Sequence, residues 1–178
     1  MSVGIAVAGV AGFGAYGFGH DEPSTLAYLF SVTALGVVVA LVRREPLPDW
    51  LALTLAGLAL GHLAGGLVTV GDAVLYNLHP GLPVFQYDHV VHAGASGVAA
   101  VVVWGYLAPR LDSIVAVIIV SFLGALGVGA INELIEFLAT LAHRGGNVGG
   151  YFNTGWDLVS NTIGAVLAIV VLVLRHRS

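Results

Sequence analysis

The sequence contains no cysteine and no lysine, and only 9% of its 178 residues are charged. Without cysteine the chain has no disulfide framework, no thiol nucleophile and no thiolate metal site. The basic residues are six scattered arginines and the formal net charge is −4, so there is no basic patch of the kind that binds nucleic acid. These absences exclude thiol-dependent enzymes, disulfide-stabilised domains and nucleic-acid-binding proteins.

Apolar residues are what the chain has in abundance. They make up 58% of the sequence, and the mean hydropathy of +0.96 is far above that of soluble globular proteins. Long apolar runs, as at 98–103, 114–120 and 166–174, are typical of membrane-spanning helices. The composition does not shift along the chain, so we expect a single transmembrane domain over residues 1–178, with the lipid bilayer as its surroundings.

Polar separators marked by proline or glycine divide the chain into six apolar segments. The first segment lacks the basic start of a signal peptide, and we interpret it as a retained span. The 25 glycines allow close helix packing, and glycine-rich helix faces could also support an oligomer. We therefore predict an all-α integral membrane bundle of about six transmembrane helices, at about 3–19, 25–42, 50–70, 89–108, 113–142 and 157–174.

The arginines predict how these spans are oriented. If the C-terminus is cytoplasmic, five of the six arginines lie on the cytoplasmic side and only Arg144 lies outside, as the positive-inside rule requires. Both termini are therefore predicted to be cytoplasmic. Most acids and histidines then fall on or toward the opposite side, which predicts a multi-pass protein of the cell membrane whose polar site faces the outer side.

Four clusters of polar residues interrupt the apolar segments. A charge within membrane-spanning sequence is costly and usually marks a functional site. Within the clusters, spacings of three or four residues place several side chains on one face of a helix. The clusters are His62; Asp88, His89 and His92; Asn132, Glu133 and Glu136; and Asp157 with Asn161.

Carboxylates combined with imidazole form a ligand set that suits zinc, iron or manganese better than copper(I). Glu133 and Glu136 are the principal candidates and the predicted catalytic residues, because like charges one turn apart repel unless a cation or a proton intervenes. Pairing with Arg144 or a shared proton is the alternative for these two acids. The predicted ligands of one or two divalent metal ions are Asp88, His92, Glu133, Glu136 and Asp157.

The other polar residues also have structural interpretations. Thr154 and Asp157 have the spacing of a capping box, with Thr154 as N-cap of the last helix. Asp88 could cap the fourth span and interact favourably with its dipole. His89 could simply face headgroups or water, and His62, on a glycine-rich helix face, could make a polar contact between helices.

Three short motifs stand in order on consecutive segments: Tyr-Asp-His-Val-Val-His-Ala-Gly at 87–94, Asn-Glu-Leu-Ile-Glu at 132–136, and Asn-Thr-Gly-Trp-Asp-Leu at 153–158, followed by Gly164-Ala165. Together they resemble the YjdF-like family of small polytopic bacterial inner-membrane proteins, over roughly residues 50–175. The resemblance singles out the same five residues as the metal-ligand prediction. The family has no assigned reaction, so the resemblance implies a site and leaves the activity open.

Three functions are compatible with this pattern. The first is a metal-dependent hydrolase, in which a metal-bound water attacks an ester or phosphoester of a lipid-like substrate and one carboxylate could serve as general base. The second is a proton- or cation-coupled membrane carrier, and the third is an accessory membrane subunit. The one-sided polar set and the lack of an inverted repeat favour the hydrolase over the carrier.

Overall fold

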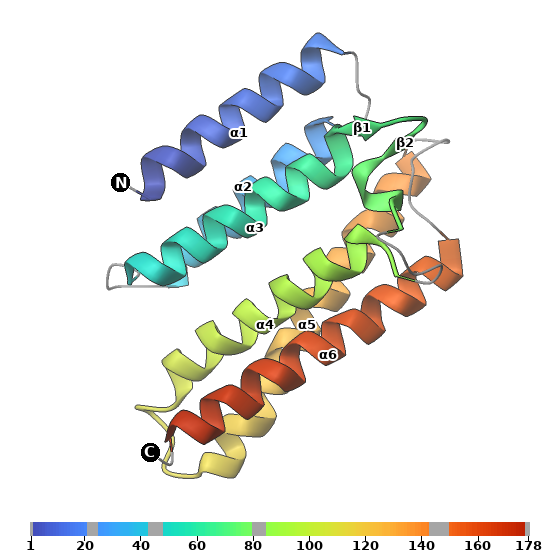
Figure 1. Ribbon diagram of the computed structural model, residues 1–178. Helices are drawn as coiled ribbons and strands as arrows, with labels where there is room; N and C mark the ends of the chain where they lie inside the picture. The colour runs from blue at the N-terminus through green and yellow to red at the C-terminus, as the bar shows by residue number, and fades with distance from the viewer. Residues whose placement is uncertain (1, 21–24, 43–47, 80–84, 143–149, 177–178) are drawn as a thin grey trace. The chain divides into compact units, whose positions relative to one another are not determined.

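The computed structural model describes residues 2–20, 25–42, 48–79, 85–142 and 150–176. Helices form most of this part of the chain and lie where the apolar segments predicted them, which confirms the all-α fold (Figure 1). They are α1 (Ser2–Gly19), α2 (Thr25–Val42), α3 (Asp49–Leu67), α4 (Tyr87–Leu107), α5 (Ile114–Ala142) and α6 (Gly150–His176).

The third segment ends earlier than expected and is followed by a small hairpin. Helix α3 ends at Leu67, and the strands β1 (Thr69–Val70) and β2 (Ala73–Val74) pair antiparallel around Gly71, whose φ of 65° suits glycine. A short 3-10 helix, η1 (Leu75–Asn77), comes directly after β2. The predicted span to residue 70 therefore includes three residues that turn away from the helix.

The last helix begins earlier than expected. Helix α6 starts at Gly150, whose φ of 61° marks the entry of the chain, and the predicted start was residue 157. The added residues are glycine, polar or aromatic residues that form no continuous apolar run, so hydropathy does not mark them as part of the span. Asp157 consequently lies inside the helix, and its interpretation as part of an N-terminal capping box is wrong.

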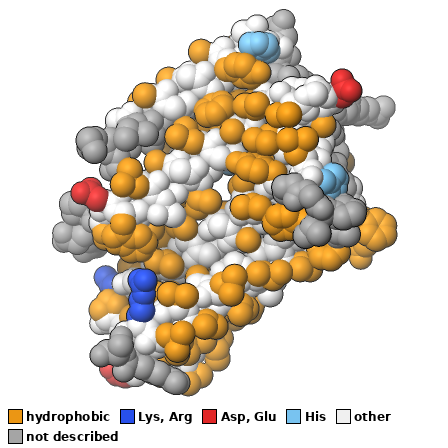
Figure 2. All heavy atoms as spheres, in the orientation of Figure 1, with side chains coloured by type: hydrophobic (Ala, Val, Ile, Leu, Met, Phe, Trp, Pro, Cys, Tyr) orange, Lys and Arg blue, Asp and Glu red, His pale blue; other side chains and the backbone are white. Residues whose placement is uncertain are grey.

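Most helices of the described part of the chain have the length and the surface of membrane spans. Four of them are long and apolar enough to cross a membrane, namely α3, α4, α5 up to Leu138, and α6, while the apolar stretch 7–19 of α1 is shorter. Large hydrophobic side chains such as Leu123 and Leu167 are exposed on α5 and α6, and hydrophobic side chains spread over the face shown in Figure 2. The protein is therefore a membrane protein with several apolar helices. The cytoplasmic position of both termini stays a prediction.

The chain divides into two compact units, Met1–Asp88 and His89–Ser178, which we describe separately. The expectation of a single domain stays a prediction. In the first unit, glycines of α3 make room for aromatic rings: a Cβ at Gly65 would overlap the ring of Tyr76, and one at Gly66 would overlap the ring of Tyr28. Helix α3 thus packs closely against both α2 and η1.

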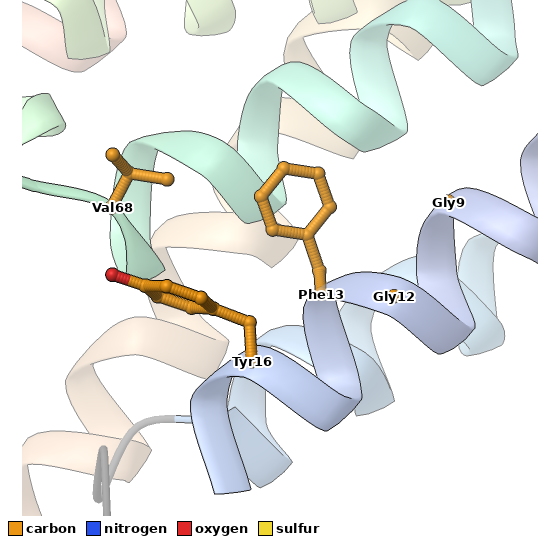
Figure 3. Close-up of a pocket in the computed structure, with 5 residues that line it drawn as sticks. All are labelled: Gly9, Gly12, Phe13, Tyr16 and Val68. Atoms are coloured by element: carbon orange, nitrogen blue, oxygen red, sulfur yellow. The ribbon is translucent and has the colours of Figure 1, made fainter. Parts of the chain in front are cut away.

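An apolar pocket lies beside α1 in the first unit (Figure 3). The side chains of Phe13 and Tyr16 project from α1 toward Val68, just after the end of α3. Gly9 and Gly12 complete the lining, and a Cβ at Gly9 would overlap the side chain of Leu60. Small residues of α1 therefore set its distance from α3.

In the second unit, α4, α5 and α6 pack in layers spaced by one helical turn. Ala100, Ala125 and Ala165, one from each helix, are completely buried in the hydrophobic core. Trp104 and Ile169 lie one turn further along α4 and α6 in the same core. Small side chains let helices approach closely in a membrane, so this alanine layer draws the three helices together.

Helices α4 and α6 come close to one another beside this layer. The carbonyl oxygen of Gly164 lies 3.3 Å from the position that a Cβ of Gly97 would occupy. A Cβ at Gly164 itself would overlap the backbone carbonyl of Ala93. The clash would involve backbone atoms, which cannot rotate aside as the end of a flexible side chain can.

We therefore expect Gly164→Ala to destabilise the protein by about 1–3 kcal/mol, the usual cost of overpacking. The measurement is the midpoint of thermal unfolding of the detergent-solubilised protein. Gly155→Ala is the matched control on the same helix, because no atom lies within 4 Å of a Cβ there. Equal unfolding midpoints for the two variants would contradict the close α4–α6 packing.

Candidate metal centre

The centre is formed by one buried side chain from each helix of the second unit. His92 of α4, Glu133 of α5 and Asp157 of α6 have exposed fractions of 6%, 8% and 0%. Each of them lies eight residues, or about two turns, from the buried alanine of its own helix. Because helical residues four apart share a face, each polar side chain lies on the same face as its alanine. The packing that forms the alanine layer therefore also brings these three polar side chains to one level.

The imidazole of His92 lies between the two carboxylates. Its Nδ1 is 3.5 Å from Oε1 of Glu133, and its Nε2 is 3.9 Å from Oδ1 of Asp157. The two ring nitrogens thus face acids on two different helices. Burying a carboxylate is costly unless it is paired or binds a cation, so this arrangement requires either protons or a metal ion between the groups.

Two asparagines hold further carboxylate oxygens in place. The side-chain amide of Asn132 donates a hydrogen bond of 2.7 Å to Oε1 of Glu136. The amide of Asn153 donates one of 2.6 Å to Oδ2 of Asp157. Both pairs are spaced i,i+4, so the helices themselves fix the geometry. Outer hydrogen bonds of this type orient the carboxylates of metal sites.

Two overlapping groups of side chains could each hold a metal ion. One consists of Asp88, His92 and Asp157, and the other of His92, Glu133 and Glu136. In each group, one ligand atom per residue lies within 4.8 Å of the others. Nitrogen and oxygen donors in this number suit zinc, iron or manganese. The five residues singled out by the sequence therefore come together in two groups that could hold a metal ion and that share His92.

His89 is a correction to the sequence interpretation. We expected it to face headgroups or water, but it is buried, with an exposed fraction of 5%. Its Nε2 lies 3.9 Å from Oδ1 of Asp157, and its ring packs against Trp156 with 6.2 Å between centroids. Two imidazoles therefore face the same oxygen of Asp157. The buried partner is on another helix, so the sequence around His89 could not reveal it.

The remaining interpretations of the acids have different outcomes. Asp88 lies in the first turn of α4, where a carboxylate interacts favourably with the helix dipole, and it also belongs to one metal-binding group. The alternative that Arg144 neutralises Glu133 or Glu136 concerns a residue outside the described part of the chain. Asn153 was overlooked as a site residue, although its i,i+4 spacing from Asp157 repeats that of Asn132 and Glu136.

A second polar layer lies one turn beneath the centre. The hydroxyl of Ser96 donates a hydrogen bond of 2.8 Å to Oδ1 of Asn161, and both side chains are buried. Gly129 of α5 makes room for this amide, because a Cβ there would overlap it. Within the described residues, Nδ2 of Asn161 makes no hydrogen bond. The layer next to the centre is thus polar, and the alanine layer follows one turn further along the helices.

His62 belongs to a separate hydrogen-bond network in the first unit. Its Nδ1 pairs with the hydroxyl of Tyr76, and its Nε2 lies 3.0 Å from Oγ of Ser31. The Ser31 hydroxyl donates its single hydrogen to the carbonyl of Tyr28, at 2.9 Å. Nε2 of His62 must then donate to Ser31, and Nδ1 must accept from Tyr76. The predicted polar contact of His62 between helices is confirmed.

One family model matches the chain, and it covers residues 1–178. Its description is "Predicted membrane protein (DUF2238)". The match is consistent with the resemblance to a YjdF-like family without an assigned function. No curated protein and no solved structure matches the chain.

The network around His62 predicts a stability effect. Tyr76→Phe removes the hydroxyl that donates to Nδ1 of the half-buried His62, and the loss of an intramolecular hydrogen bond costs about 0.5–1.5 kcal/mol. We expect a lower midpoint of thermal unfolding in detergent. Tyr151→Phe is the control, because Tyr151 is 89% exposed and its loss of a hydroxyl should change nothing. An unchanged midpoint for Tyr76→Phe would show that the network does not stabilise this unit.

Proposed function

The chain belongs to the DUF2238 family of predicted membrane proteins, and we propose that it is a metal-dependent hydrolase embedded in the membrane. The proposed centre consists of Asp88, His92, Glu133, Glu136 and Asp157. It would bind a divalent ion of zinc, iron or manganese. The proposed substrate is a lipid-like ester or phosphoester that reaches the centre from the outer leaflet.

The burial of opposed acids and imidazoles among apolar helices is the observation that supports this proposal most. Glu133 and Asp157 lie on opposite sides of His92, and both are almost inaccessible to solvent. Ionised groups within a membrane are rare and usually functional. If these acids served only the structure, apolar residues in their place would often leave the protein equally stable or more stable. The cost of desolvating a buried ion pair can exceed the attraction between its charges.

A divalent ion bound here would polarise the scissile group and lower the pKa of a bound water. Glu133 or Glu136 would accept the proton of that water as general base, and Asn132 keeps Glu136 oriented for this role. The water oxygen forms a bond to the carbonyl carbon or phosphorus, and the bond to the alcohol oxygen breaks. The same carboxylic acid then returns the proton to the departing alkoxide.

The surroundings of the two glutamates support a lipid-like substrate. Leu134 and Phe137, the neighbours of the two acids along α5, are 54% and 56% exposed. In a bilayer such side chains contact acyl chains, because no water is present to cover them. A substrate diffusing within the leaflet would therefore meet the centre without leaving the hydrocarbon region.

A carrier is the second candidate, and the polar layer of Ser96 and Asn161 favours it, because it extends the polar interior by one turn. Ser121 is also completely buried, but it lies 12 residues before Glu133 on α5, or roughly 18 Å along the helix. Between these levels stand Ala100, Ala125 and Ala165, which offer no polar group to a passing ion. Because this apolar layer interrupts any polar path along the helices, we consider the carrier a weaker candidate than the hydrolase.

The proposal predicts a stoichiometric divalent metal and metal-dependent lipid hydrolysis. We expect elemental analysis of the purified protein to find zinc, iron or manganese. In proteoliposomes, mass spectrometry should detect hydrolysed lipid, and a chelator should abolish the reaction until metal is returned. Glu133→Gln and Glu136→Gln should each lower the rate by about 100-fold or more, the range attributed to general acid–base catalysis.

Asp112→Asn is the control for these variants, because it removes an exposed acid in the turn before α5. It should retain both metal and activity. Hydrolysis that survives the chelator would rule out the metal-dependent mechanism. Proton or cation uptake into vesicles that Glu133→Gln abolishes, without any lipid hydrolysis, would replace the hydrolase with the carrier.

A further inference from the structure

The two metal-binding groups compete for one imidazole. The group with Asp88 and Asp157 lies on the Nε2 side of His92, and the group with Glu133 and Glu136 includes the acid that faces Nδ1. A neutral imidazole has one nitrogen with a lone pair and one that carries a proton. His92 can therefore bind an ion through one nitrogen only, while the other nitrogen carries the proton and faces the acid opposite.

The distances favour the Nδ1 side for the ion. With zinc–nitrogen and zinc–oxygen bonds of about 2.0–2.2 Å, two ligands at the tetrahedral angle stand roughly 3.4 Å apart. Nδ1 of His92 and Oε1 of Glu133 are 3.5 Å apart, which fits this value with little rearrangement. Nε2 and Oδ1 of Asp157 are 3.9 Å apart, and an ion between them would need a ligand angle of roughly 140°.

The partners of Asp157 indicate a different role for this acid. Its Oδ1 faces the Nε2 atoms of both His89 and His92, and its Oδ2 accepts a hydrogen bond from Asn153. Three nitrogen groups thus surround one completely buried carboxylate. Histidine ligands of metals commonly donate their second nitrogen to a carboxylate in this way, which fixes the ring and increases its basicity.

Charge balance agrees with this division. Two ionised glutamates and a neutral imidazole offset the charge of one divalent ion. Asp157 and the half-buried Asp88 then carry the remaining negative charge, and the carboxylate of Asp157 lies beside two imidazoles and the amide of Asn153. A second ion beside Asp157 would have to displace these donors.

Resting on the proposed metal centre, we propose that the chain binds a single ion on the Nδ1 side of His92, with Glu133 and Glu136 as the other protein ligands. Each glutamate would bind through one carboxylate oxygen, which leaves the second oxygen of one of them to act as the general base. Asp157 is a positioning residue that orients His92 and His89 and does not contact the ion. Nε2 of His92 keeps its proton and directs it at Asp157. The structure thereby assigns the two acids that face His92 to different roles.

Zinc titration of the chelator-treated full-length protein in detergent tests this assignment. The wild type should bind one ion per chain, and Glu133→Gln and Glu136→Gln should each lose it. Asp157→Asn should still bind one ion, with affinity weakened about 10–100-fold, as expected for the loss of an orienting partner. Asp112→Asn, which changes an exposed acid, should bind like the wild type. Two ions per chain, or loss of zinc in Asp157→Asn with retention in Glu133→Gln, would overturn the assignment.

A measurement on the wild type covers the case in which a variant does not fold. Nitrogen NMR of zinc-loaded, histidine-labelled protein should show His92 metallated at Nδ1 and protonated at Nε2. Metallation at Nε2 would refute the proposal. The outcome is separable from that of the proposed activity, since a chain that binds zinc at Nδ1 without hydrolysing lipid supports this assignment and removes the hydrolase.

Discussion

The burial of ionisable side chains in an apolar helical bundle is the constraint on which the second unit depends. The effective penalty for burying a charge in a protein is several kcal/mol after relaxation, and it is offset only by well-placed partners. Glu133 and Asp157 obtain such partners from His92, which stands between them. Three helices must therefore hold one register, because a shift of one residue on any of them would turn a polar side chain toward lipid.

The layers of the second unit follow from this register. One turn from the centre, the hydroxyl of Ser96 donates a hydrogen bond to Oδ1 of Asn161, and Gly129 leaves the space that the amide requires. The side chains of the alanine layer carry no polar group, and their small size lets the helices pack closely. The opposed acids and imidazoles thus lie two turns from the alanine layer, and that layer provides close packing. The first unit uses the same means at a smaller scale, where glycines of α3 admit the rings of Tyr28 and Tyr76.

Hydropathy predicted the helices because lipid requires every backbone group to be bonded within its own segment, so an apolar run of sufficient length has few alternatives. It failed at the hairpin at 69–74 and at the first two turns of α6, where glycine, polar and aromatic residues form no continuous apolar run. Helical spacing likewise predicted which acids share a face. It could not predict that His89 is buried, because its partners Asp157 and Trp156 belong to another helix. The spacing of residues within one helix does not reveal how two helices pack against each other.

The alanine layer has a consequence for the size of ion that the centre can accept. Ala100, Ala125 and Ala165 fix the separation of the three helix axes, and the ligand atoms two turns away inherit that separation. Calcium binds about six to eight oxygen ligands at about 2.3–2.6 Å, whereas zinc usually binds four ligands at about 2.0–2.3 Å. If the centre holds the proposed ion, helices held close together by these methyl groups would favour a small one, although the three alanines are not among its ligands.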